Sequence, residues 1–340
     1  MNKRTAIALT AGAVALILDS RCAAQSARDA LDLCARTLIP SLFPLLVLGA
    51  MLVPCLADIR IPILARLLGI PAGAEGIWLL GALGGFPVGA ASIVQSVHCG
   101  TLSKTDGERM LGLCSLCGSA FLFGVLPQFL SMSEVTAIFI IQLETSLLLG
   151  VLCPGKTTGR CAPVSRSISL AEAVQRGIHA ILNLCAWVTL AGVVAGFLRR
   201  WLFPLLPEPM GTICTGLLEL TGGIYALPDN GRFLLATLFV CFGGVSVLLQ
   251  IGGLASDADL SMWTCVLQKS LHAALGTATA WLWTKVGLFA FLFPPILVLA
   301  KMGLEIPGRL LYNTEERKGS ECCFGKPWSG PASTAASARK

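Results

Sequence analysis

Four stretches of about twenty residues carry no Asp, Glu, Lys or Arg, and they constrain the fold more than any other feature of the sequence. They are residues 37–57, 110–133, 177–198 and 233–256. A helix of about 20 apolar residues crosses the roughly 30 Å hydrocarbon core of a bilayer. Only 13% of the chain is charged, and the mean hydropathy is +0.77. A soluble domain of this composition would expose large apolar patches, so the sequence predicts an all-α polytopic membrane protein.

The formal net charge of +6 does not indicate a nucleic-acid partner. The basic residues stand at the ends of apolar runs, where orientation in a bilayer explains them. The fourteen cysteines lie mostly within apolar segments, where Cys behaves as a small hydrophobic residue. We therefore expect the lipid bilayer as the surroundings of the chain and no nucleic acid as a partner.

The N-terminus has the charged start and short apolar core of a signal peptide, with a helix expected at 5–19. Ala23 and Ala24 suggest a cleavage site. Because many further apolar spans follow, retention as a signal-anchor helix over residues 1–27 is favoured.

Two apolar segments contain helix breakers in their middle. One is 76–100, and the other is 211–228, which holds the sequence LLELTGG. The breakers are Gly84, Gly85 and Pro87 in the first segment and Gly222, Gly223 and Pro228 in the second. An interrupted backbone persists at membrane depth only where protein or water covers it. Each segment is therefore predicted to form a re-entrant hairpin.

The remaining apolar runs predict uninterrupted spans. These cover residues 37–57, 110–130, 135–153, 177–198, 233–254, 262–284 and 286–300. Residues 58–75 are weakly amphipathic and are expected at the membrane interface. From Met302 onward the composition shifts to Glu, Lys, Gly, Ser and Pro, which predicts a disordered tail over 303–340.

The two broken segments belong to an internal repeat. LLGALGG (79–85) and LLELTGG (217–223) both begin with Leu-Leu and end with Gly-Gly. A helix of similar length precedes each, and an Arg, an apolar run and a cluster of small residues follow. We assign a first gate-like repeat to 28–153, a basic cytoplasmic loop to 154–176 and a second repeat to 177–302. Chance similarity between Leu-rich and Gly-rich membrane segments is the alternative.

Charge placement orients the two repeats. Lys3 and Arg4 place the N-terminus inside, and the basic loop 154–176 then returns to the inside. The second repeat consequently runs opposite to the first, so the topology is inverted. Paired broken helices in inverted repeats are the architecture of secondary transporters, in which solutes bind near the midplane. Glu219 fits this pathway because an intramembrane carboxylate needs a partner, a proton or water.

Several sequence blocks resemble the sporulation integral membrane protein YlbJ family, within the wider group of nucleoside-transporter and ferrous-iron-transporter gate domains. The blocks are LIPSLFPLLVLGAML (38–52), GALGGFPVGAASIVQ (81–95), LSKTDGERMLGLCSLCGSAFLFG (102–124), LLELTGG and FGGVSVLLQ (242–250). The resemblance covers roughly residues 28–300. It implies a multi-pass protein of the bacterial cytoplasmic membrane, needed for the spore cortex, with no assigned enzymatic reaction. Kinship with gate domains implies a nucleoside-like or other small polar solute.

The chain departs from that family at two places. Phe86 stands where a Tyr is common, and Leu248-Leu249 precede Gln250 where a His is frequent. The second difference puts any His-dependent step in doubt.

Candidate pathway residues gather around the two breaks and the small-residue clusters. Glu219 is the first candidate, with a carboxylate at a helix end near water as the alternative. Thr221 offers a hydroxyl to a solute or bonds back to its own helix. The other candidates are Gly84, Gly85, Pro87, Ser119, Gly222, Gly223, Gly243, Gly244, Ser246 and Gln250. Their alternatives are helix packing, a simple kink or interfacial placement. Glu144 and Asn183 are further intramembrane polar residues.

No catalytic or metal-binding motif stands out. Cys114 and Cys117 form one C-x-x-C within an apolar run, and the three histidines are far apart. The sequence lacks a Walker loop, a G-x-S-x-G and an H-E-x-x-H. We expect no enzyme, cofactor or metal. The leading hypothesis is a permease or gate, and the rival is a non-transporting scaffold for a sporulation assembly. Partners would be a small polar solute and a second copy or sporulation membrane proteins.

Overall fold

Every regular element in the described part of the chain is a helix. The structure, a computed structural model, describes residues 3–57, 59–153, 161, 168–207 and 210–287. Five helical segments are long and apolar enough to cross a bilayer: Ser20–Met51, Lys104–Gln128, Met132–Leu152, Leu170–Trp201 and Arg232–Asp257. The prediction of an all-α, multi-pass membrane protein is thus confirmed at this level. The apolar run 286–300 and the tail 303–340 lie outside the described residues, apart from the end of one helix at Val286.

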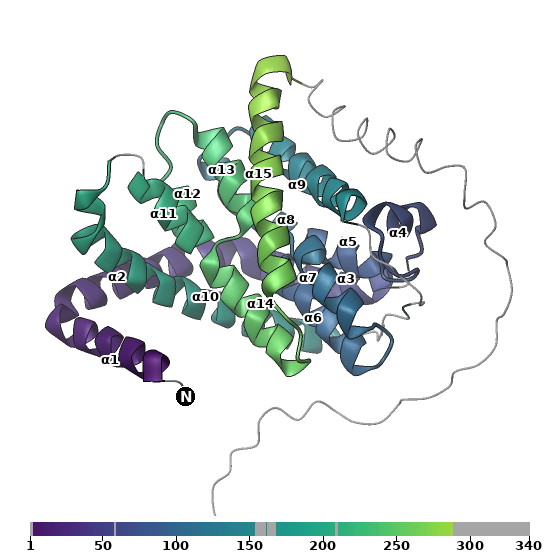
Figure 1. Ribbon diagram of the computed structural model, residues 1–340, viewed down its shortest axis with the longest axis horizontal. Coiled ribbons are helices and arrows are strands. Elements are labelled where there is room, and N and C mark those ends of the chain that lie inside the picture. Colours follow the sequence, from purple (N-terminus) through teal and green to yellow (C-terminus); the bar gives the residue numbers. More distant parts are fainter. Residues whose placement is uncertain (1–2, 58, 154–160, 162–167, 208–209, 288–340) are drawn as a thin grey trace, which may run out of the picture.

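The helices follow one another with short connections (Figure 1). In chain order they are α1 (Lys3–Leu18), α2 (Ser20–Leu33), the π-helix η1 (Cys34–Leu38), α3 (Ile39–Ala57), α4 (Pro62–Leu68), α5 (Glu75–Gly84), α6 (Phe86–His98), α7 (Lys104–Cys114), α8 (Ser119–Val125), the 3-10 turn η2 (Leu126–Gln128), α9 (Met132–Leu152), α10 (Leu170–Trp201), the 3-10 turn η3 (Phe203–Leu205), α11 (Met210–Leu218), α12 (Leu220–Tyr225), α13 (Arg232–Phe242), α14 (Val245–Asp257) and α15 (Trp263–Val286).

The helix expected at 5–19 is present as α1 (Lys3–Leu18), whereas the helix expected at 37–57 begins well before residue 37. α2, η1 and α3 run without a break from Ser20 to Ala57, and the expected boundary after residue 27 lies within α2. Asp19 caps α2 by accepting a hydrogen bond from the Cys22 N–H. Pro40 cannot donate to the carbonyl one turn earlier. The chain widens to a π-turn over Cys34–Leu38, a form that accommodates such a residue without ending the helix.

Four interruptions divide the inner helices. α5 and α6 separate at Gly85, and α11 and α12 separate at Glu219. These breaks confirm the interruptions predicted for 76–100 and 211–228. The other two correct the prediction of uninterrupted spans at 110–130 and 233–254. α7 ends at Cys114 before α8 begins at Ser119, and α13 ends before Gly243-Gly244.

The two glycines at 243 and 244 end α13 because of their backbone conformation. Their φ angles are 88° and 89°, in the left-handed region that residues other than Gly rarely adopt. Such angles cannot continue a right-handed helix.

The interrupted helices pack against several longer ones. α15 packs against α7, α9 and α13, and Figure 1 shows it upright between α13 and α9. On the other side, α10 packs against α2 and α3. α4 packs on α9 and buries Leu64 and Leu68. This part of the segment expected at the membrane interface therefore also packs on protein. This arrangement encloses the four interruptions.

Candidate functional site

The interruptions meet in pairs through backbone contacts. A Cβ added to Gly118 would lie 2.9 Å from the Gly85 Cα, so the α5–α6 and α7–α8 breaks touch directly. A Cβ on Gly244 would lie 3.2 Å from the Leu220 nitrogen, which joins the α13–α14 break to the α11–α12 break. Only glycine permits such close backbone contact. Each half of the chain therefore contributes one pair of facing interruptions.

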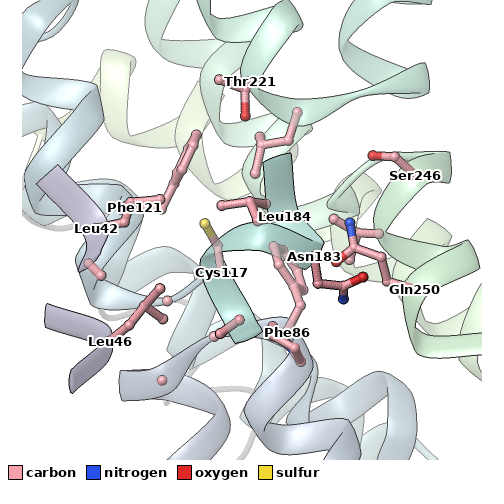
Figure 2. A pocket seen from close by; sticks show the side chains of 18 of the residues that line it. Leu42, Leu46, Phe86, Cys117, Phe121, Asn183, Leu184, Thr221, Ser246 and Gln250 are labelled. Atoms are coloured by element: carbon pink, nitrogen blue, oxygen red, sulfur yellow. The ribbon is translucent and has the colours of Figure 1, made fainter. Parts of the chain in front are cut away.

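A cavity of about 100 Å³ lies where the two pairs approach each other (Figure 2). Its volume is enough for several water molecules or a small solute. Seven of the predicted pathway residues line it: Gly84, Gly85, Pro87, Glu219, Thr221, Ser246 and Gln250. Asn183 and Cys117 also contribute to the lining. The apolar lining comes from Leu42, Leu46, Phe86, Ala120, Phe121, Leu184, Leu220 and Val247 together with Gly118 and Ala180.

Glu219 caps its own helix. It is 5% exposed and is the N-cap residue of α12. Its Oε1 accepts from the Thr221 N–H at 2.9 Å, and its Oε2 accepts from the Gly222 N–H at 2.6 Å. These are helix N-terminal amides that lack a partner within the helix, and a carboxylate there is also stabilised by the helix dipole. The predicted partner of the intramembrane carboxylate is thus found in the backbone next to it.

Gly222 and Gly223 do not form the turn that the sequence match predicts. The turn is at Glu219, whose φ of −148° any residue can adopt. Gly223 lies within α12, where an added Cβ would overlap the Gly216 Cα on α11. The sequence match aligns Gly85 with Gly223. In the structure, the residue at the turn is Gly85 in the first break and Glu219 in the second. Close packing across the break, rather than backbone freedom, requires glycine at 223.

Pro87 and Ser119 act together at the first break. Pro87 is in the first turn of α6, where a residue would lack a helical partner for its N–H in any case. In an unbroken helix, residue 87 would donate to the Leu83 carbonyl. Ser119 Oγ donates to that carbonyl at 2.9 Å instead. Ser119 is thus a partner of the end of α5 and is not part of the cavity lining.

Three polar side chains are directed to the cavity without a partner. Asn183 on α10 and Ser246 and Gln250 on α14 line it, and Figure 2 shows them on one side of the cavity. None of them makes a side-chain hydrogen bond with another described residue. Ser246 and Gln250 are four residues apart, so they lie on the same face of α14. This side of the cavity can donate and accept hydrogen bonds to a polar solute.

Gly243 and Gly244 lie behind the lining instead of within it. A Cβ on Gly243 would lie 3.0 Å from the Phe86 ring, which itself lines the cavity. The two glycines therefore shape the cavity indirectly, through Phe86 and through the break at Glu219.

Side chains of α9 and α15 satisfy the exposed backbone of the α7–α8 break. Gln142 accepts from the Cys117 N–H at 3.1 Å and donates to the Cys117 carbonyl at 2.9 Å. Lys269 Nζ donates to the Ser115 carbonyl at 3.0 Å. Ser146 Oγ donates to the Leu113 carbonyl at 2.9 Å. Protein groups thus cover the interrupted backbone in place of water.

Lys269 and His272 are the polar residues that sequence reasoning missed. Both are at most 1% exposed and lie within the run 262–284, which the sequence predicts to be an apolar span. A Lys followed three residues later by a His puts two ionisable groups on one helix face. That pattern, inside a helix otherwise suited to a bilayer, was the available signal.

Cys114 is buried at the end of α7, and Cys117 is buried within the α7–α8 break. Glu144 on α9 has a buried Oε2 without a hydrogen-bond partner among the described residues. Neither feature adjoins a cluster of three metal-ligating side chains within the described ranges.

Comparisons of the chain with protein-family models, with curated proteins and with solved structures found no match.

Proposed function

We propose that the chain is a permease or gate for a small polar solute, and that the cavity between the four interruptions is its binding site. One observation carries the proposal. Helix interruptions from both halves of the chain converge on a cavity in which Asn183, Ser246 and Gln250 have free hydrogen-bonding groups. Ser246 and Gln250 are buried, whereas Asn183 is exposed. Buried polar groups without partners are costly in a membrane protein, so a ligand or water is expected beside Ser246 and Gln250.

The order of elements supports two inverted repeats. The first half contains α3, the broken pair α5–α6, the broken pair α7–α8 and α9. The second half contains α10, α11–α12, α13–α14 and α15 in the same order. In two cases the matching elements also pack on each other: α3 on α10 and α9 on α15. Contacts between equivalent elements are expected around a two-fold axis, which inverted repeats possess.

The lining favours a solute with one flat apolar side and one polar side. Phe86 and Phe121 contribute aromatic surface, whereas Asn183, Ser246 and Gln250 contribute amides and a hydroxyl. A neutral solute fits this lining, since Glu219 is already engaged by two backbone amides. A nucleoside-like molecule has these properties, in agreement with the kinship to gate domains that the sequence blocks suggest.

The resemblance to the YlbJ family supports a role in spore cortex formation, in the cytoplasmic membrane of a sporulating bacterium. The rival function is a non-transporting scaffold for a sporulation assembly. One observation favours the rival: Glu219, the first candidate for a pathway residue, caps a helix. A scaffold that kept the fold would still need that cap.

The test is an uptake screen in proteoliposomes with a panel of nucleosides, amino acids and sugars. We expect one chemical class to accumulate in vesicles that contain the protein and not in empty vesicles. The variant Gln250→Leu should reduce the uptake about tenfold, because it leaves a solute group unpaired. Gln95→Leu is the matched control, since Gln95 is exposed on α6 and lies outside the cavity.

Two results would favour the scaffold instead. One is uptake that does not differ between protein-containing and empty vesicles for any member of the panel. The other is a stable protein partner that co-purifies in detergent with both the wild-type chain and Gln250→Leu.

A further inference from the structure

We propose that the Lys269 ammonium occupies a cation site at the C-terminal end of α7. The positive charge that this broken helix requires is thus supplied by a side chain of the protein itself. The inference concerns the fold and does not depend on whether a solute moves. It rests on the groups around the ammonium, on their lack of a carboxylate and on the place of α7 in the wall of the cavity.

The groups around the ammonium are electron-rich. Lys269 Nζ lies 3.0 Å from the Ser115 carbonyl oxygen, 3.4 Å from His272 Nδ1 and 5.3 Å from the centroid of the Phe86 ring. His272 Nε2 lies 3.0 Å from the Gln142 carbonyl oxygen, which can only accept. We therefore assign the hydrogen to Nε2, which leaves Nδ1 as an acceptor for Lys269. A carbonyl, an imidazole lone pair and an aromatic face all attract a cation.

The end of α7 explains why a positive charge is stable there. Ser115 is the C-cap residue of α7, so its carbonyl belongs to the negative end of the helix dipole. Cations are favoured at helix C-termini, and more so where water is excluded. No salt bridge among the described residues involves Lys269, although it is fully buried. The dipole and the acceptors replace the carboxylate that a buried Lys normally has.

Two further acceptors lie in the same contact between α7 and α15. Ser115 Oγ and Gln268 Oε1 are buried without a hydrogen-bond partner among the described residues. Gln268 contacts α7 at Gly112, where an added Cβ would overlap the amide. Unpaired buried acceptors indicate room for a water molecule or another donor. Gln268 Oε1 is an acceptor, and the Ser115 hydroxyl can accept as well as donate, so each can bind a further donor in this contact.

The site is next to the proposed solute cavity. Phe86 begins α6 and lines the cavity, and its ring faces the ammonium. Cys117, two residues after Ser115, also lines the cavity. Loss of the cation would therefore change both the α7–α8 break and one wall of the cavity.

The test replaces the tethered cation by a free one. Lys269→Ala removes the ammonium and the stem, and Lys269→Met removes the charge while keeping the length. We expect both to unfold about 5 °C or more below wild type in detergent, because a buried carbonyl loses its donor. Adding n-butylammonium chloride should restore the midpoint of Lys269→Ala in a saturable manner. Wild type, Lys269→Met and the exposed control Lys285→Ala should show no saturable shift.

Choline chloride at equal ionic strength controls for salt, because choline is too bulky for the space of a lysine side chain. The proposal is overturned if butylammonium shifts Lys269→Ala no more than choline does, or if Lys269→Met is as stable as wild type. Should Lys269→Ala fail to fold, the comparison of Lys269→Met with wild type decides by itself. Uptake assays play no part, so failure here and failure of the proposed function are distinguishable.

Discussion

At the scale of single residues, the structure places Glu219 at a helix end, as the alternative reading of the sequence proposed, and assigns it the role of a cap. A carboxylate in an apolar run indicates function because it needs a partner. Here the partners are the Thr221 and Gly222 amides, which the break itself exposes. Glu219 still lines the cavity. It can hold the shape of the site whether or not it contacts a solute.

Removing the Glu219 carboxylate should lower stability in two steps. We expect Glu219→Gln to cost about 1 kcal/mol, because its amide group faces one of the two N–H donors, and Glu219→Ala to cost about 2 kcal/mol. Thermal unfolding in detergent measures both. Asp257→Asn is the control, since Asp257 is exposed at the end of α14. Equal midpoints for the two Glu219 variants and wild type would contradict the capping role.

The residues near each position explain why the sequence indicates Glu219 and not Lys269. Glu219 stands three residues from Gly216 and from Gly222, and these helix breakers mark the segment. Lys269 stands in a continuous helix, α15, without a breaker nearby. Its partners Ser115 and Phe86 are over 150 residues away in the chain. Contacts of that range are not encoded in local spacing.

At the scale of elements, glycine contacts hold the breaks together. Gly216 and Gly223 bring α11 and α12 into backbone contact, and Gly85 and Gly118 bring the two breaks of the first half together. Small residues allow helices to approach closely where no hydrophobic force drives them together. Gly223 is thus required for close helix packing, which was the alternative to a turn. Gly85 differs, because its φ of 89° requires glycine for the turn.

Two Gly→Ala substitutions should have opposite effects. Gly223→Ala places a methyl group against the Gly216 backbone and the Phe239 ring, so we expect a loss of about 1–3 kcal/mol. Gly253→Ala on α14 meets nothing within 4 Å and should gain up to about 1 kcal/mol from helix propensity. Unfolding midpoints of both variants test this. A Gly223→Ala protein at least as stable as Gly253→Ala would show that α11 and α12 do not pack this closely.

The sequence predicted two of the four breaks. The break at Gly85 follows from Gly and Pro placed in the middle of an apolar run. The second break was predicted from Gly222 and Gly223 but lies at Glu219, three residues before Gly222. The breaks at 115–118 and 243–244 fall within charge-free runs of ample length for a span. Small residues such as Gly118 and Gly243 occur equally in helix packing. Only contacts with other segments, such as Gln142 with Cys117, separate these two possibilities.

At the scale of the whole molecule, the two halves have the same order of elements. Equivalent elements pack on each other in two cases, α3 with α10 and α9 with α15. The sequence match between the halves pairs Gly85 with Gly223, but the two turns lie at Gly85 and Glu219. At the broken segments, the sequence match and the structural match therefore differ by four residues. A short local match is therefore weaker support for duplication than the order of helices and breaks.

The inverted arrangement predicts which side of the membrane each connection faces. Gln175→Cys, near the start of α10, should react with a membrane-impermeant thiol reagent from the cytoplasmic side. Asn230→Cys, after α12, should react only from the opposite side. Both positions are exposed, and the assay requires prior replacement of the exposed Cys99 and Cys153. Reaction of both from one side would contradict the inversion.

The most direct test of the central claim, that the interrupted helices enclose a water-accessible solute site, is thiol labelling at Ser246. Ser246→Cys is treated in vesicles with a charged methanethiosulfonate, and mass spectrometry locates the label. The native Cys241 on α13, which is fully buried and outside the lining, is the internal control. We predict that position 246 is labelled, that Cys241 is not, and that the transported solute slows the labelling. A position 246 as unreactive as Cys241 from both faces of the membrane would contradict the account.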